Sequence, residues 1–373
     1  MIANRRPKSF WRKLPFLPDN LWLNVLLLAV PVAFVLHFVH ASPLAIFTFA
    51  CLAIIPLAAV LGNATETLAV YSGPAIGGVL NATMGNAAEL IIAFFALRAG
   101  HIEVVKASLS GSIIGNILLV LGLSILVGGI GREKQTFSRT VSSSNSTMLF
   151  IAAIALIMPA VYDLAVFGSL KEGHAVLQKM SLWTSFVLMA VYLISFIFML
   201  KTHKPLFTVQ REDEPQHKPV MSRKAALITL AASTVLIAFF SEMLVAEIEA
   251  VTNTIGLTEL FVGVIVVAII GNAAEHSAAI MVAHRNKMDL ALGIAVGSST
   301  QIALFVAPLL VMISWIMGSP MSLVFNAFEL AAIVLSILVV EMISYDGETN
   351  WFEGAQLLAV YVILAMSFYF VPG

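Results

Sequence analysis

The sequence predicts an all-α polytopic membrane protein, and three observations support this fold class. First, 60% of the 373 residues are hydrophobic and only 11% are charged, whereas soluble domains average about 45–50% apolar and about 25% charged residues. Second, the apolar residues gather in runs long enough to cross a bilayer, which takes about 20 helical residues. Third, the motif Gly-Asn-Ala-Ala-Glu occurs twice inside such runs, at residues 85–89 and, 186 positions later, at residues 271–275.

Eleven apolar runs are long enough to be transmembrane helices. None has the alternation over about ten residues that the strands of a membrane barrel require. A basic leader before an apolar run is typical of a signal peptide, but Leu21 to Val39 is long enough to span and is interpreted as a retained first helix. The runs cover residues 21–40, 44–72, 75–99, 105–130, 146–162, 180–200, 224–246, 257–284, 288–316, 322–343 and 354–371.

The basic residues predict the orientation, because Lys and Arg favour the cytoplasmic side of a membrane. With the N-terminus in the cytoplasm, sixteen of the twenty Lys and Arg residues fall inside, within residues 1–20, 132–139, 201–224 and 285–287. The four on the outside are Arg98, Lys106, Lys171 and Lys179. One missed helix would destroy this bias of Lys and Arg toward the cytoplasmic side, so the bias also supports the count of eleven helices.

One hydrophilic connection divides the chain into two halves. Residues 1–20 are a basic cytoplasmic N-terminus and residues 21–40 form an extra first helix. Five helices follow in residues 41–200. A cytoplasmic linker, residues 201–223, carries the short acidic stretch Glu212–Glu214, and five more helices lie in residues 224–373. An odd number of helices per repeat gives two copies of opposite topology, the plan of many secondary transporters.

The repeat extends beyond the two motifs. At the same offset, Gly111-Ser112 aligns with Gly297-Ser298. A weaker sequence similarity precedes each motif, with Thr65-Glu66-Thr67-Leu68 in the first half and Ser241-Glu242-Met243-Leu244 in the second. Glycines at 73, 77 and 78, together with Pro74, favour a broken helix before the first motif, since irregular backbone is tolerated in a membrane where it lines a cavity.

The duplicated motif predicts a cation site. A carboxylate within the membrane is costly and therefore usually functional, and Asn and Glu three residues apart share one face of a helix. The candidate ligands all offer oxygen, which suits a hard cation such as Ca²⁺ or Mn²⁺, whereas Zn²⁺ and copper prefer His or Cys. Glu89 and Glu275 are the expected metal ligands, joined by Asn86, Asn272, Ser112 and Ser298.

Two facing carboxylates at low dielectric would not both stay ionised without a cation, so protons or Na⁺ ions must replace the metal when it leaves. This balance predicts an antiporter.

Four further groups of residues have roles that the sequence leaves open. Glu66 and Glu242 either line the ion path or are interfacial, and His276 either packs or relays protons. Glu329 and Glu341 have no assigned role. The acidic stretch is either a solvated loop or a cation sensor.

The residues resemble the Ca²⁺/H⁺ exchanger (CAX) family of the cation/Ca²⁺ exchanger superfamily. The resemblance rests on Gly-Asn-Ala-Ala-Glu-Leu, Gly-Asn-Ala-Ala-Glu-His and Gly-Ser-Ser-Thr-Gln-Ile-Ala at 297–303. It implies an extra helix before two inverted five-helix repeats, and Ca²⁺ export from the cytosol against protons, with Glu89 and Glu275 in the central site. Na⁺/Ca²⁺ exchangers tend to carry Pro before the glutamate, and its absence here favours protons.

We therefore expect a transporter and not an enzyme, with Ca²⁺ and H⁺ as transported ions and no cofactor. The lipid bilayer is the expected partner. A net charge of −1 gives no reason to expect nucleic acid. The short loops favour a prokaryotic plasma membrane over a vacuolar or other organelle membrane. The alternatives are a Na⁺-coupled or broader divalent-cation exchanger of the same fold and, less favoured, a Ca²⁺-permeable channel. The oligomeric state is not predicted.

Overall fold

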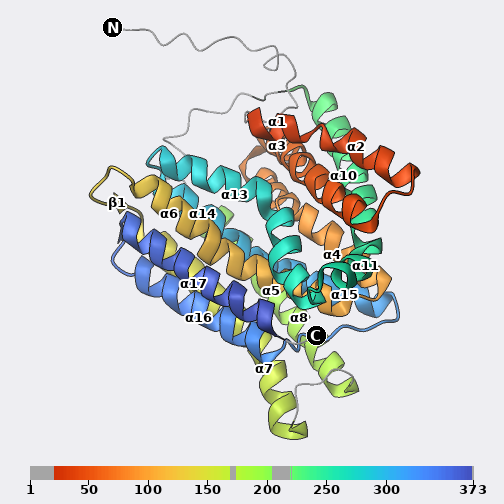
Figure 1. Cartoon of the computed structure of the whole chain (residues 1–373). Helices are drawn as coiled ribbons and strands as arrows, with labels where there is room; N and C mark the ends of the chain where they lie inside the picture. The colour runs from red at the N-terminus through yellow and green to blue at the C-terminus, as the bar shows by residue number, and fades with distance from the viewer. Residues whose placement is uncertain (1–20, 169–173, 204–218, 220, 372–373) are drawn as a thin grey trace.

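The computed structural model describes residues 21–168, 174–203, 219 and 221–371 (Figure 1). The basic N-terminus and the acidic stretch Glu212–Glu214 lie outside these residues. Apart from two strands of two residues each, the regular elements of the described part are helices. Helices satisfy all backbone hydrogen bonds within one segment, as a membrane interior requires. The prediction of an all-α polytopic fold is confirmed.

The elements follow one another with short connections. The first half contains α1 (Leu21–Leu26), α2 (Ala29–Phe38), α3 (Pro43–Met84), α4 (Ala87–Ala99), α5 (Ile102–Ile114), η2 (Gly115–Val120), α6 (Leu121–Gly129), β1 (Gln135–Thr136), α7 (Arg139–Phe167), α8 (Ala175–Ile197) and η3 (Phe198–Thr202). The second half contains α10 (Arg223–Ala246), α11 (Ile248–Ile255), α12 (Glu259–Phe261), η4 (Val262–Val267), α13 (Ala268–His284), α14 (Met288–Gln301), η5 (Ile302–Val306), α15 (Ala307–Ile316), α16 (Ala327–Ser344), β2 (Glu348–Thr349) and α17 (Trp351–Phe370).

Within the described residues, nine helices are long and apolar enough to cross a membrane. A tenth span is present if the bent pair Ile76–Met84 and Ala87–Ala99 is counted as one. The predicted first helix is present as the shorter apolar segment Trp22–Phe38, which is divided into α1 and α2. These elements account for all eleven predicted runs.

Several predicted boundaries differ from those of the helices: α7 extends beyond the run at 146–162 on both sides, and α8 begins five residues before residue 180. The apolar run at 322–343 suggested a helix from residue 322, but α16 begins at Ala327, and residues 319–326 have no regular secondary structure. Asn326 caps α16, since its side chain accepts from the backbone N–H of Glu329 at 2.9 Å. The apolar residues before it, including Leu323 and Phe325, are buried, so hydropathy alone could not separate them from the helix.

The predicted helix break occurs at two places. Gly73 has φ 79°, which a glycine adopts readily, and it ends the span Pro43–Gly73. The next span bends by 46° between Met84 and Ala87, within the first motif. In the second half α13 runs through its motif without a bend. Both halves instead share a π-helical segment, η2 and η5, directly after the helices α5 and α14 that carry Ser112 and Ser298.

The two halves are joined by hydrogen bonds at one end of the molecule, here called the strand end. There β1 pairs antiparallel with β2, with Gln135 opposite Thr349. The Gln135 side chain also donates to the carbonyl of Ala283 at 3.2 Å and to Asn286 at 3.1 Å, in the turn between α13 and α14. Figure 1 shows β1 close to the ends of α6 and α17.

Close backbone packing joins α6 to α17. Gly122 and Gly354 lie opposite each other, and a Cβ added at Gly122 would lie 3.2 Å from the carbonyl oxygen of Gly354. A Cβ at Gly354 would collide with the backbone of Leu126. Small residues allow such close approach in membrane bundles.

We expect Gly354→Ala to destabilise the protein by about 1–3 kcal/mol, because the added methyl group overpacks a backbone contact. The measurement is thermal unfolding of the purified chain in detergent. Gly62→Ala is the matched control, since nothing lies within 4 Å of its added Cβ, and it should be neutral or stabilising by up to about 1 kcal/mol. A Gly354→Ala variant as stable as Gly62→Ala would contradict the packing.

Candidate functional site

The two motif glutamates lie inside the molecule, and three of their four carboxylate oxygens have no hydrogen-bond partner. Glu89 is in the first turn of α4 and its side chain is only 8% exposed. Neither of its carboxylate oxygens has a hydrogen-bond partner, and Oε2 of Glu275 on α13 also lacks one. Buried polar groups are almost always paired, so three unpaired carboxylate oxygens in one region indicate a site that takes a ligand from outside the chain.

Each glutamate packs against the glycine of the other motif. A Cβ added to Gly271 would lie 2.9 Å from Cγ of Glu89, and one added to Gly85 would lie 3.0 Å from Oε1 of Glu275. The two contacts are equivalent, because the two glycines are 186 residues apart and so are the two glutamates. The glycine of the motif therefore provides the space in which the opposite carboxylate lies.

The predicted Asn and Ser residues meet with the same reciprocity. Asn272 donates to Oγ of Ser112 at 2.9 Å, and Ser298 donates to Oδ1 of Asn86 at 3.1 Å. Each Asn thus pairs with the Ser of the other half. All four residues are buried. The structure brings the six predicted site residues into one region of the bundle.

Two residues that the sequence analysis did not identify complete this network. Asn116 in η2 donates to Oδ1 of Asn272 at 3.0 Å and to Oγ of Ser298 at 3.1 Å. Gln301, at the end of α14, accepts from Asn86 at 2.6 Å. Both lie within four residues of a predicted serine, in the Gly-Asn and Thr-Gln pairs that follow it. A polar residue one turn beyond Ser112 or Ser298 was the signal that could have found them.

His276 belongs to the network and not to the carboxylate pair. Its Nε2 lies 3.2 Å from Oδ1 of Asn116. The contact orients the Asn116 amide, whose Nδ2 then points to Asn272 and Ser298. This placement fits the packing role considered for His276.

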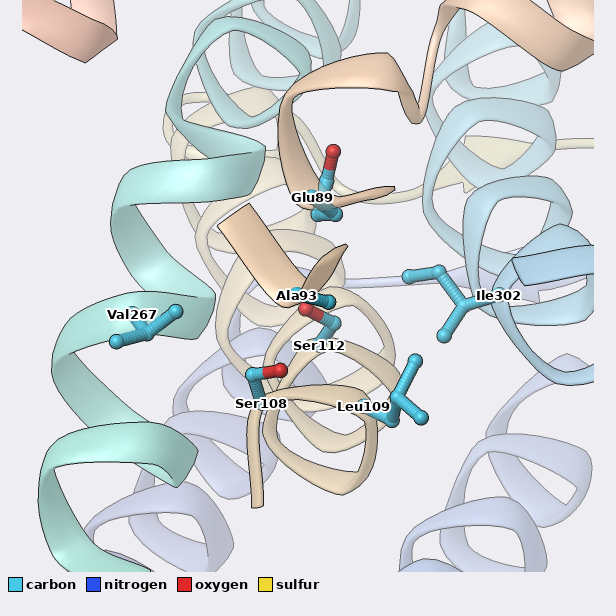
Figure 2. Close-up of a pocket in the computed structure, with 7 residues that line it drawn as sticks. All are labelled: Glu89, Ala93, Ser108, Leu109, Ser112, Val267 and Ile302. Atoms are coloured by element: carbon cyan, nitrogen blue, oxygen red, sulfur yellow. The ribbon is translucent and has the colours of Figure 1, made fainter. Parts of the chain in front are cut away.

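A small cavity adjoins Glu89 (Figure 2). Its lining includes Ser112 and Ser108 of α5 together with Ala93, Leu109, Val267 and Ile302. Figure 2 shows Glu89 at one end of this group and Ser108 and Leu109 at the other, with the drawn carboxylate oxygen of Glu89 directed away from both serines. The cavity therefore extends the site along α5, away from the carboxylate.

The donor set suits a hard cation. Within the part of the chain that the structure describes, no three His, Cys, Asp or Glu side chains gather in a metal-binding group, and Cys51 is buried on α3. Two carboxylates surrounded by amide and hydroxyl groups match the oxygen preference of Ca²⁺. The amides and hydroxyls already bond to one another, so the carboxylate oxygens are the atoms that a cation would contact first.

The other acidic candidates lie elsewhere. Glu66 on α3 and Glu242 on α10 are exposed, and Glu242 lies 3.8 Å from Arg98. Glu329 is buried at the start of α16, while Glu341 is half-buried near its end.

Comparisons with known proteins agree with this geometry. The family model described as sodium/calcium exchanger protein matches residues 42–201 and 225–370. A Ca²⁺/H⁺ antiporter of Aphanothece halophytica is 45% identical over 360 residues, covering 93% of this chain and 96% of that protein. The Ca²⁺/H⁺ antiporter ChaA of Bacillus subtilis is 44% identical over 343 residues, covering 91% and 96%.

A solved structure of native YfkE has a TM-score of 0.81 and 42% identity, and the match covers 94% of this chain and 100% of that one. Sequence, fold and duplicated site agree. The chain belongs to the sodium/calcium exchanger protein family, in the branch of the Ca²⁺/H⁺ exchangers.

Proposed function

We propose that this protein is a Ca²⁺/H⁺ antiporter that exports Ca²⁺ from the cytosol in exchange for protons by alternating access. One observation carries the proposal: Glu89 and Glu275 lie over each other's motif glycine, and three of their four carboxylate oxygens are enclosed without a hydrogen-bond partner. Two carboxylates balance the charge of one divalent cation. Unpaired buried charges are costly, so when Ca²⁺ leaves, protons must take its place before the site can change its exposure.

The ligand roles follow from the contacts. Glu89 and Glu275 bind Ca²⁺ and protons in competition, and no resident cofactor takes part. Asn86, Asn272, Ser112 and Ser298 hold the two motif helices in register around the carboxylates and offer neutral oxygens when the network opens.

Unequal packing of the two halves supports alternating access. Gly111 on α5 lies against the backbone of Val264 in η4, and Gly263 lies against Ala107. The equivalent of Gly111 in the second half is Gly297, and nothing lies within 4 Å of a Cβ added there. The close contact is therefore made on one side of the site only. An exchange of open and closed packing between the two halves would move the access from one side to the other.

We also propose the arrangement in the membrane. The N-terminus and the strand end face the cytoplasm, and the membrane is the plasma membrane of a prokaryote. The halves are the five-helix repeats 41–200 and 224–373, related by inverted topology, with residues 21–40 as the added helix and residues 201–223 as the linker.

Proteoliposome uptake tests the choice of counter-ion. We expect Ca²⁺ uptake to follow an imposed pH gradient and to proceed without Na⁺, because protons can neutralise both carboxylates. Uptake that ignores the pH gradient but follows a Na⁺ gradient would replace the proposal with a Na⁺-coupled exchanger. Flux without any counter-ion gradient, in single-channel steps, would indicate a channel.

Glu89→Gln and Glu275→Gln should each reduce exchange at least about 100-fold, since disrupting a buried charged site costs about 3 kcal/mol or more and each 1.4 kcal/mol is tenfold. Glutamine keeps the shape and loses the titratable charge. The control is Glu348→Gln, which removes an exposed carboxylate paired with Lys134 at the strand end and should leave exchange unchanged. Full activity in either site variant would refute the central role of the pair.

Glu66→Gln and Glu242→Gln should reduce exchange by about two- to fivefold, the range expected for exposed charges. Initial rates of Ca²⁺ uptake measure the effect. Arg98→Gln is a useful companion, because it separates loss of the Glu242 carboxylate from loss of the Arg98–Glu242 contact. If both glutamate variants behave as wild type, these residues are interfacial and lie off the ion path.

A further inference from the structure

A second pair of buried charges lies outside the cation site. Lys106 on α5 is only 2% exposed, and its Nζ donates to the carbonyl oxygen of Val324 at 2.6 Å. Glu329 on α16 is 1% exposed. Each bonds across the interface between α5 and the segment 324–329, and a Coulombic attraction also links them, although Lys106 is attracted more strongly by Glu103. Buried charges are costly within membrane spans and are retained when they are paired and serve a purpose.

Glu329 connects the start of α16 to α5. Its Oε2 accepts from the backbone N–H of Asn326 at 3.0 Å, which completes a capping box at the first turn of α16. Its Oε1 accepts from the hydroxyl of Ser110 at 2.7 Å. The capping carboxylate is therefore shared between two helices. Lys106 and Ser110, one helical turn apart on α5, both bond to the segment 324–329.

This connection fixes the helix that supplies part of the cation site. Ser112 lies two residues after Ser110, and Asn116 follows one turn later, in η2. On the other flank, Gly111 contacts the backbone of Val264. The segment that carries Ser112 is thus held between α16 and η4. A shift of α5 along its axis would lengthen the hydrogen bond from Asn272 to Ser112 and those that Asn116 donates.

We propose that Lys106 and Glu329 are a positioning pair that holds α5 in the register at which Ser112 and Asn116 meet the cation site. The inference rests on the proposed function, because it names residues that tune Ca²⁺ binding at that site. The pair is not part of the duplicated arrangement. At the offset of 186, Leu292 is the equivalent of Lys106, and Ser143 is the equivalent of Glu329.

The test uses Lys106→Met, Glu329→Gln and the double variant of the full chain, in two assays. The first measures initial rates of Ca²⁺ uptake in proteoliposomes and gives KM and the maximal rate. The second measures thermal unfolding in detergent without added Ca²⁺. Removal of one member takes an attracting group away from the other buried charge, whereas removal of both leaves neutral groups of similar size. The control pair is Lys134→Gln with Glu348→Gln, which removes an exposed ion pair at the strand end.

Each single variant should raise KM for Ca²⁺ by about tenfold, and the double variant should return it to within about threefold of wild type, as expected for coupled neighbours. Ser110→Ala removes only the hydroxyl that holds Glu329, so it should fold normally and raise KM by about two- to tenfold. The control pair should leave KM unchanged.

Two results would overturn the proposal. One is a double variant whose KM is no better than that of the worse single variant. The other is a set of variants, including Ser110→Ala, that lose thermal stability while KM stays at the wild-type value. Failure of the wild-type chain to take up Ca²⁺ would refute the proposed function. In that case, non-additive thermal unfolding would still support the coupling of Lys106 to Glu329, and additive unfolding would contradict it.

Discussion

The structure depends on placing two carboxylates together inside a membrane protein. Glu89 and Glu275 have no hydrogen-bond donors of their own for most of their oxygens, which in an ordinary core would be strongly destabilising. The surrounding residues make this arrangement possible. Glycines at 85 and 271 create the space, and the Asn–Ser pairs hold the helices together while three carboxylate oxygens stay without a partner. The most costly groups in the chain are thus kept available for an ion.

The neutral residues around the two glutamates form hydrogen bonds with one another. Asn116 bonds to Asn272, Ser298 and His276, and Gln301 bonds to Asn86. Because these groups satisfy one another, they cost little to bury. They also link spans from both halves, so a change in one half is transmitted to the other through the same hydrogen bonds. A polar network that joins both halves around two titratable groups suits an exchanger, because the ion and the protons bind at the carboxylates while the network rearranges with the halves.

Much of this could be predicted from the sequence, because intramembrane polar residues are rare and repeat at a constant offset. The length of the apolar runs predicted the helices, and the constant offset predicted the two glutamates and the four Asn and Ser residues. Asn116 and Gln301 were missed because π-helical segments begin at Gly115 and Ile302, and the equivalents of these residues in the other half are apolar or glycine. The start of α16 was misplaced because buried extended residues are as hydrophobic as helical ones. The Lys106–Glu329 pair was not recognised, since its members are more than 200 residues apart and have no repeat partner.

The antiparallel pairing of β1 with β2 has a consequence for how the chain is held together. Each strand comes from a different half, and Gln135 fastens the pair to the turn after α13. Together with the contact between α3 and α10, this gives the halves a noncovalent interface of their own. Two separately translated polypeptides, cut between residues 203 and 221, would each keep one side of these contacts, which hold the halves together independently of the peptide bond that is cut.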